Sequence, residues 1–320
     1  MTSDLRIVFM GTPEFAVESL DALVKNNYNV VGVITAPDKP AGRGMKIQFS
    51  AVKEYALRNN LNLFQPEKLK NPEFIETLKA LHPDLQVVVA FRMLPEVIWK
   101  MPRLGTFNVH SSLLPQYRGA APINWAVING EKETGVTTFF INENIDTGDI
   151  IFSEKVTIGE DETAGELHDH LMKIGAELIV RTVEAIREGN LNIQKQEKTD
   201  NEIKPAPKIF KEDCRINWSK DLDSIHNFIR GLSPFPSAFT EINSPENKKY
   251  YLKVFKSSKE KADHILSIGK IQTDQKYFLK IAVTGGFINL LEIQLEGRKK
   301  MAVKDFLRGF HLNEEWNLLS

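Results

Sequence analysis

The sequence contains a single cysteine, and no apolar run in it is long enough to cross a membrane. Cys214 has no partner for an internal disulfide, which also excludes a zinc site built from a cysteine cluster. The residues after Met1 lead into an apolar stretch without a basic segment or a small-residue cleavage site. We therefore expect the chain to act in a reducing cytoplasm, as a monomer.

Two catalytic motifs are also absent. Gly11-Thr12-Pro13 follows the first apolar run, where a dinucleotide fold carries Gly-x-Gly-x-x-Gly, so a nicotinamide cofactor is disfavoured. Pro13 instead suits the first turn of a helix. No serine or cysteine occupies a strand-to-helix nucleophile elbow, which argues against an acyl-enzyme. The incoming substrate is then expected to be the nucleophile.

The net charge of −1 hides an asymmetry along the chain. Residues 206–320 carry 19 Lys and Arg against 14 Asp and Glu, which leaves 22 against 28 in residues 1–205. A basic second part is a modest indication of a polyanionic partner, because Lys and Arg neutralise phosphates. An ordinary solvated surface is the alternative explanation.

Residues 1–189 show apolar runs that alternate with helical patterns, which predicts an α/β domain with a doubly wound, mainly parallel sheet. The expected strands are 5–10, 30–35, 85–90, 106–109, 135–141 and 150–156, and the expected helices are 13–26, 50–60, 71–81 and 163–188.

A polar segment with Pro205 and Pro207 marks residues 190–207 as a linker. Beyond it, a helix is expected at 221–230, and short alternating runs at 250–255, 269–271, 278–283 and 287–294 are separated by turn residues. This pattern predicts a smaller antiparallel β-barrel of the OB type over residues 208–320, a fold used by many nucleic-acid-binding modules.

Asn108 and His110 are two residues apart on an expected strand, so both side chains point to the same face. Pro115 and Gly119 then break the pattern into a loop, which puts the pair at the carboxyl end of the strand, where open α/β sheets bind ligands. An amide donor beside an imidazole can stabilise an oxyanion and move a proton. Taken alone, His110 could equally be a strand-end histidine without chemistry.

The sequence around this pair resembles the active-site signature of the folate-dependent formyltransferases. The matching residues are Asn108, His110, Ser112-Leu113-Leu114-Pro115, Tyr117-Arg118-Gly119-Ala120-Ala121-Pro122 and Ile145-Asp146-Thr147-Gly148-Asp149. The resemblance runs from residues 8–15 to residues 230–236, and so covers nearly the whole chain. It implies a Rossmann-like formyltransferase core as the catalytic domain and a C-terminal tRNA-binding barrel. It further implies that 10-formyltetrahydrofolate is the formyl donor and that no metal is needed.

The resemblance assigns catalysis to Asn108, His110 and Asp146. Asn108 and a protonated His110 would stabilise the oxyanion, while a nearby carboxylate favours the charged imidazolium. Asp146 would accept the proton of the attacking amine through a water. A simpler reading of Asp146 is an Asx residue that shapes a tight turn.

The same match implies a folate pocket lined by residues from two segments: Val89, Ala90, Phe91, Arg92, Ser112, Leu113, Leu114 and Pro115. A core strand running into a helix cap explains the apolar part of the first segment without any ligand, but it does not explain Arg92.

The Gly- and Pro-rich basic loop at residues 38–46 matches the segment that, in family members acting on tRNA, contacts the acceptor end. Lys39, Arg43 and Lys46 are its candidate contacts, and a plain surface excursion is the alternative. This loop and the basic second domain favour initiator methionyl-tRNA as the acceptor of the formyl group, in translation initiation. An amino-sugar nucleotide or a glycinamide ribonucleotide is the alternative acceptor, and a catalytically inactive RNA-binding module is the alternative class.

Overall fold

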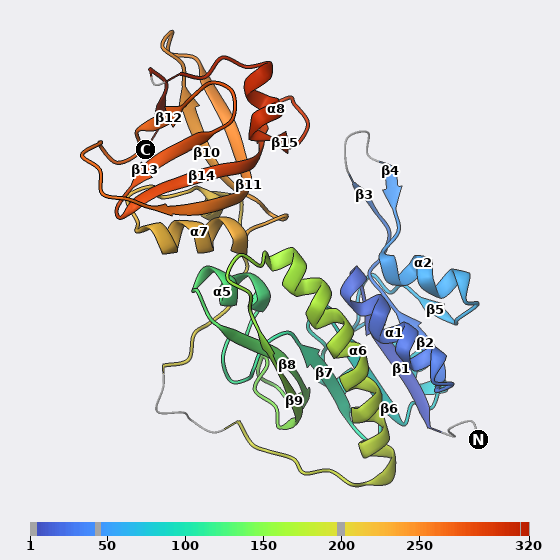
Figure 1. Ribbon diagram of the computed structural model, residues 1–320. Helices are drawn as coiled ribbons and strands as arrows, with labels where there is room; N and C mark the ends of the chain where they lie inside the picture. The colour runs from blue at the N-terminus through green and yellow to red at the C-terminus, as the bar shows by residue number, and fades with distance from the viewer. Residues whose placement is uncertain (1–4, 42–45, 197–201, 314, 320) are drawn as a thin grey trace. The chain divides into compact units, whose positions relative to one another are not determined.

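The structure is a computed structural model of the chain, and it describes residues 5–41, 46–196, 202–313 and 315–319. The chain forms two compact units (Figure 1). The first consists of Met1–Pro122, Thr134–Val156 and His168–Pro205, and the second of Ile123–Glu133, Thr157–Leu167 and Ala206–Ser320. The second unit therefore includes two short segments that lie well before the linker in sequence.

The first unit contains a seven-stranded sheet with the order β5-β2-β1-β6-β7-β8-β9. Its strands are β1 (Arg6–Gly11), β2 (Asn29–Ile34), β5 (Leu63–Phe64), β6 (Leu85–Val89), β7 (Thr106–His110), β8 (Glu133–Phe140) and β9 (Ile150–Thr157). The pairs β1–β2, β2–β5, β1–β6 and β6–β7 are parallel, whereas β8 runs antiparallel to β7. The predicted α/β fold with a mainly parallel sheet is confirmed.

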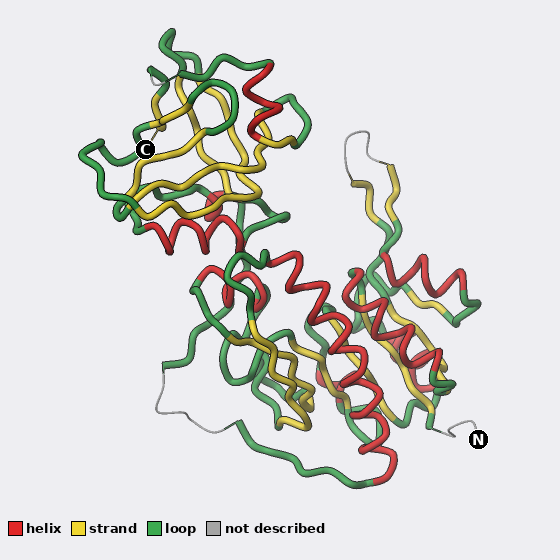
Figure 2. Tube along the Cα trace, in the orientation of Figure 1, coloured by secondary structure: helices red, strands yellow, loops and turns green. Residues whose placement is uncertain are grey.

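Helices accompany this sheet, as Figure 2 shows in red. They are α1 (Glu14–Lys25), α2 (Ala51–Arg58), α3 (Pro72–Ala80), α4 (Glu96–Trp99) and α6 (Ala164–Glu188). Local sequence sets where two of them begin. The Ser50 hydroxyl accepts a hydrogen bond from the backbone N–H of Lys53, and the Asn71 side chain caps α3 in the same way. Pro72 follows at the start of α3, where its missing N–H costs nothing.

Both faces of the sheet are covered. Val8 and Met10, two apart on β1, pack with Leu78 of α3 and Ile98 of α4 in one buried cluster. On another part of the sheet, α6 packs closely against β7 and β8. A Cβ placed on Gly175 would lie 3.6 Å from Val109 and 3.7 Å from Val136. Burial on both faces explains why the central strands are continuous apolar runs.

The second unit contains an antiparallel sheet with the order β12-β13-β14-β11-β10-β16, with β15 paired to β14. Its strands are β10 (Ala238–Asn243), β11 (Lys249–Lys261), β12 (Ile271–Thr273), β13 (Leu279–Val283), β14 (Gly286–Leu295), β15 (Met301–Ala302) and β16 (Asn317–Leu319), and its helices include α5 (Pro122–Ile128), α7 (Leu222–Gly231) and α8 (Val303–Arg308). An isolated bridge between Lys270 and Asn317 joins the two ends of the sheet order. The unit is thus a nearly closed β-barrel, as predicted.

Several elements differ from the sequence expectations. The segment expected to be a basic loop contains two short antiparallel strands, β3 (Lys39–Ala41) and β4 (Lys46–Gln48), which form a hairpin (Figure 1). The short helix α5 and the strand β10 were not predicted. β10 follows closely on two prolines, Pro234 and Pro236, which mask its strand pattern. None of the described helices has both the length and the apolarity needed to span a membrane.

Candidate active site

Strand β7 places Asn108 and His110 on one face of the sheet, as their spacing predicted. Asn108 lies in register with Val88 of β6 and Phe139 of β8. The Oδ1 atom of Asn108 is buried and has no hydrogen-bond partner among the described residues. A buried amide oxygen without a partner costs free energy, so Oδ1 is suited to accepting a hydrogen bond from a ligand.

His110 is nearly buried, with 7% of its surface exposed, and one ring nitrogen is already bonded. Its Nε2 atom lies 2.8 Å from the backbone oxygen of Tyr117. A carbonyl oxygen can only accept, so Nε2 must carry a hydrogen and donate it. In the neutral ring, Nδ1 is then the nitrogen without a hydrogen.

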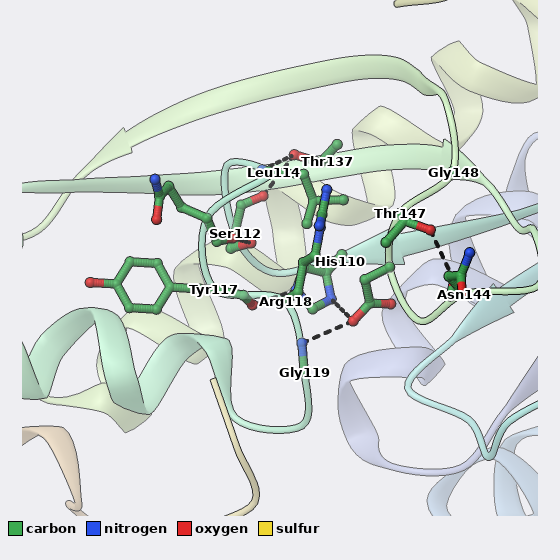
Figure 3. A network of polar contacts seen from close by, with 12 residues as sticks. His110, Ser112, Leu114, Tyr117, Arg118, Gly119, Thr137, Asn144, Thr147 and Gly148 are labelled. Carbon is green, nitrogen blue, oxygen red and sulfur yellow. Dashed lines mark hydrogen bonds and ion pairs between the residues drawn. The ribbon is translucent and has the colours of Figure 1, made fainter. Parts of the chain in front are cut away.

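The carboxylate of Asp146 faces that second nitrogen, and dashed lines at the labelled His110 and Gly119 mark its two contacts (Figure 3). Its Oδ2 atom is 3.8 Å from Nδ1 of His110, and it accepts a hydrogen bond of 2.9 Å from the backbone N–H of Gly119. The Gly119 N–H therefore holds the carboxylate beside Nδ1 of His110. The structure brings together Asn108, His110 and Asp146, the three residues predicted to be catalytic.

The turn that carries Asp146 has a restricted backbone. Asp146 adopts a left-handed conformation with φ of 53°, which non-glycine residues rarely adopt. Gly148 lies so close to the neighbouring strand that a Cβ at this position would come within 1.6 Å of the Phe140 oxygen. Thr147 donates a hydrogen bond of 3.0 Å to the Asn142 side chain. The sequence suggested an Asx residue that shapes a tight turn. In the structure, the close approach of Gly148 to Phe140 and the Thr147 hydrogen bond also shape this turn.

The loop after β7 is held by buried hydroxyls. Ser112 is fully buried and donates a hydrogen bond of 2.6 Å to the Gln116 oxygen. Thr137 of β8 donates one of 2.7 Å to the Ser112 oxygen. The Ser112 side chain thus shapes the loop, while Leu113 and Pro115 are partly exposed. Thr137 and the backbone groups of Tyr117 and Gly119 were not predicted, because nothing in their residue types marks them.

The second predicted pocket segment follows β6. Val89 is buried, whereas Ala90 is exposed and left-handed, with φ of 45°. The Arg92 guanidinium donates to the backbone oxygens of Pro66 and Glu67, the latter at 2.8 Å. Burial lowers the pKa of Arg92. Arg92 therefore holds its own segment against residues 66–67. Of the four predicted pocket residues in this segment, the exposed Ala90 and the half-buried Phe91 are then the ones that a ligand can reach.

Two of the three predicted tRNA contacts lie on the hairpin. Lys39, at the start of β3, is exposed and in register with Gln48 of β4, and Lys46 begins β4. Arg43 falls outside the described residues. The segment therefore contains two paired strands and is not entirely an irregular surface loop.

Comparisons with known proteins match nearly the whole chain. The model of the family described as formyl transferase matches residues 5–183, and that of the formyl transferase C-terminal domain matches residues 208–311. A methionyl-tRNA formyltransferase of Bacteroides fragilis is 56% identical over 98% of both chains. One of Flavobacterium johnsoniae is 54% identical over 97% of this chain and 98% of its own.

Solved structures share the fold at lower identity. The N-formyltransferase of Helicobacter canadensis, in complex with folinic acid and dTDP-3-aminofucose, has a TM-score of 0.62 at 22% identity and covers 93% of this chain and all of its own. HypX of Aquifex aeolicus, in complex with tetrahydrofolic acid, has a TM-score of 0.64 at 17% identity, over 96% of this chain and 47% of its own. At these identities, the two structures establish the fold alone.

Proposed function

Because the chain belongs to the methionyl-tRNA formyltransferase family, we propose that it transfers the formyl group of 10-formyltetrahydrofolate to the α-amino group of methionine on initiator tRNA. The chain is a formyltransferase, an enzyme of one-carbon transfer. Its proposed place of action is the cytoplasm, as a monomer that supplies translation initiation.

The single observation that carries the proposed mechanism is the convergence of three groups at the end of β7. They are the side-chain amide of Asn108, whose Oδ1 atom has no partner among the described residues, the Nδ1 atom of His110 and the carboxylate of Asp146. None of them is a nucleophile of the kind that forms an acyl-enzyme. The arrangement supports direct attack by the substrate amine, with the protein supplying charge stabilisation and proton transfer.

The reaction follows from these positions. The neutral amine attacks the formyl carbon, a new C–N bond forms, and the carbonyl oxygen becomes an oxyanion. Asn108 donates a hydrogen bond to that oxygen, and protonated His110 donates through Nδ1 because its Nε2 is already bonded to Tyr117. The attacking nitrogen then gives its proton to Asp146, directly or through a water. As the oxyanion re-forms the carbonyl, the bond to N10 of the folate breaks, and N10 takes up the proton that the amine gave to Asp146.

Two surfaces support tRNA as the acceptor. The hairpin of β3 and β4 carries Lys39 and Lys46, Arg43 lies between the two strands in sequence, and residues 206–320 carry the excess of positive charge. In the second unit, Lys208 lies 5.2 Å from the ring of Phe210, which is 55% exposed. Exposed rings beside cations suit the stacking of bases and the binding of phosphates.

The folate is proposed to lie against Ala90, Phe91, Leu113, Leu114 and Pro115, with Val89, Arg92 and Ser112 fixing the shape of the pocket. The side chains of Ser112 and Val89 are buried, so these two residues contribute to the pocket only by fixing the path of the backbone.

A comparison of acceptors tests the function. The purified protein is supplied with 10-formyltetrahydrofolate and, separately, with charged initiator methionyl-tRNA, charged elongator methionyl-tRNA, glycinamide ribonucleotide and an amino-sugar nucleotide. We expect efficient formylation of the initiator tRNA only. Faster transfer to either small acceptor would overturn the assignment.

A further inference from the structure

The segment after α6 does more than connect the two units. Residue Gln194 forms a two-way backbone bridge with Ile150, the first residue of β9, through bonds of 2.9 and 2.7 Å. The bridge adds one backbone pairing to β9, the edge strand of the sheet. It brings Gln196, two residues further on, beside the turn that carries Asp146.

The Gln196 side-chain amide makes four hydrogen bonds there. Its Nε2 atom donates to the backbone oxygens of Asp146, at 3.0 Å, and of Gly148, at 2.7 Å. Its Oε1 atom accepts from Nε and Nη2 of Arg118, at 3.1 and 2.6 Å. One half-buried amide therefore links the Asp146 turn to the loop that follows β7.

Only an uncharged amide of this length satisfies all four bonds. The two carbonyl oxygens can only accept, and the guanidinium can only donate. A glutamate would keep the bonds to Arg118 but would place a carboxylate oxygen against two carbonyl oxygens. An alanine would leave both sides without partners.

The bond to the Asp146 oxygen acts on a residue with a constrained backbone. Asp146 is left-handed, and such conformations persist where several contacts fix them. Gly119 holds the Asp146 carboxylate at one oxygen, and Gln196 holds the Asp146 backbone. Together these contacts define where the carboxylate lies relative to His110.

A later part of the same segment contacts the loop that supports His110. The backbone N–H of Tyr117 donates to the Lys204 oxygen at 2.7 Å, and the Lys204 N–H donates to Oε1 of Gln116 at 2.8 Å. Tyr117 is the residue whose oxygen accepts from His110. The described parts of the segment thus contact the supports of both His110 and Asp146.

We propose that Gln196 is a positioning residue for formyl transfer, which orients Asp146 toward His110 by clamping the Asp146–Gly148 turn to Arg118. This inference rests on the proposed function of the His110 and Asp146 pair. It assigns the segment after α6, which belongs to the first unit, a part in building the active site.

The variants Gln196→Ala and Gln196→Glu test the clamp. We expect each to lower kcat for transfer to initiator methionyl-tRNA by about 10- to 100-fold, because small displacements of catalytic groups have effects of this size. KM for the folate and for the tRNA should change little. Gln194→Ala is the matched control: it removes an exposed amide from the same segment, keeps the backbone bridge, and should leave kcat unchanged.

A double-variant cycle with Asp146→Asn separates positioning from general stability. If Gln196 acts through Asp146, Gln196→Ala should cause little further loss in the Asp146→Asn background. Should Gln196→Ala fail to fold, as judged by thermal unfolding, Gln196→Asn takes its place in the cycle, since it keeps the amide but shortens its reach.

Two results would overturn the inference. One is a kcat of Gln196→Ala equal to that of Gln194→Ala. The other is a double variant whose fold-loss in kcat equals the product of the fold-losses of Gln196→Ala and Asp146→Asn alone. Failure of the proposed function would look different, because the unmodified protein itself would then not formylate methionyl-tRNA.

Discussion

The carboxylate of Asp146 lies 3.8 Å from Nδ1 of His110, on the side of the ring that remains after Nε2 has bonded to Tyr117. Both side chains are largely buried, at 8% exposure for His110 and 12% for Asp146. A charge at this distance, shielded from water, acts more strongly on the imidazole than it would at the surface.

The first prediction follows from this pair. Asp146→Asn keeps the shape and an acceptor for Gly119 but removes the charge, so transfer should fall by about 10²-fold or more. The measurement is kcat at saturating folate and tRNA. Asp149→Asn makes the same change three residues along the turn and should have little effect. Equal losses in the two variants would remove the special role of Asp146.

The second prediction concerns the turn itself. Gly148→Ala would place a Cβ within 1.6 Å of the Phe140 oxygen, so the turn must move or the sheet must distort. We expect a loss of about 3 kcal/mol in the free energy of unfolding and a marked loss of transfer. Gly175→Ala on α6, where the nearest atom would be 3.6 Å away, should leave stability unchanged or raise it. Denaturant unfolding of both variants decides the matter, and an unaffected Gly148→Ala would contradict the geometry.

The third prediction concerns pH and the second unit. His226 is buried, with Nδ1 at 3.1 Å from the Ser257 hydroxyl and Nε2 at 3.0 Å from an oxygen of Asp161. Burial lowers the pKa of His226 below 6.5, and the positive charges of Arg230 and Lys259 add to this, against the opposing charge of Asp161.

The sign follows from proton binding. Between the lowered pKa and about 6.5, the unfolded chain holds a proton on His226 that the folded chain does not. Stability should therefore fall as the pH drops through this window, by up to about 1.4 kcal/mol per pH unit. His226→Asn should reduce the slope of unfolding free energy against pH, and His311→Asn, at an exposed site, should not. The same slope in both variants would contradict this account.

The fourth prediction concerns acceptor choice. If the hairpin contacts the acceptor end of the tRNA, Arg43→Ala should lower the ratio of initiator to elongator efficiency by about tenfold, while KM for the folate stays the same. Arg58→Ala removes an exposed cation from α2 and serves as the control. An unchanged ratio in Arg43→Ala would mean that selectivity is determined elsewhere.

The sequence predicted where the candidate catalytic side chains lie but not the groups that hold them. Asn108 and His110 could be placed because strand periodicity is strict and the breaking residues after it are distinctive. The backbone oxygen of Tyr117 and the N–H of Gly119 could not, since every residue carries such groups. Gln196 lies in a polar segment whose composition is that of a linker, so only the folded chain reveals its four bonds.

Long-range contacts in the second unit could not be predicted either. The buried Arg230 donates to the oxygens of Gly159, at 3.2 Å, and Glu162, at 2.9 Å, across about seventy positions of sequence. No local pattern encodes such a contact. The strand periodicity of β11, β13 and β14 was visible because their alternation is local.

The central claim is that the protein stabilises the oxyanion of a direct attack with Asn108 and His110. Single-turnover transfer from 10-formyltetrahydrofolate to charged initiator tRNA, measured for Asn108→Ala and His110→Ala with both substrates saturating, tests it most directly. The account predicts that each variant slows the chemical step by about 10²- to 10³-fold while the dissociation constants of both substrates stay within a few-fold. Chemical steps close to that of the unmodified protein in both variants would contradict it.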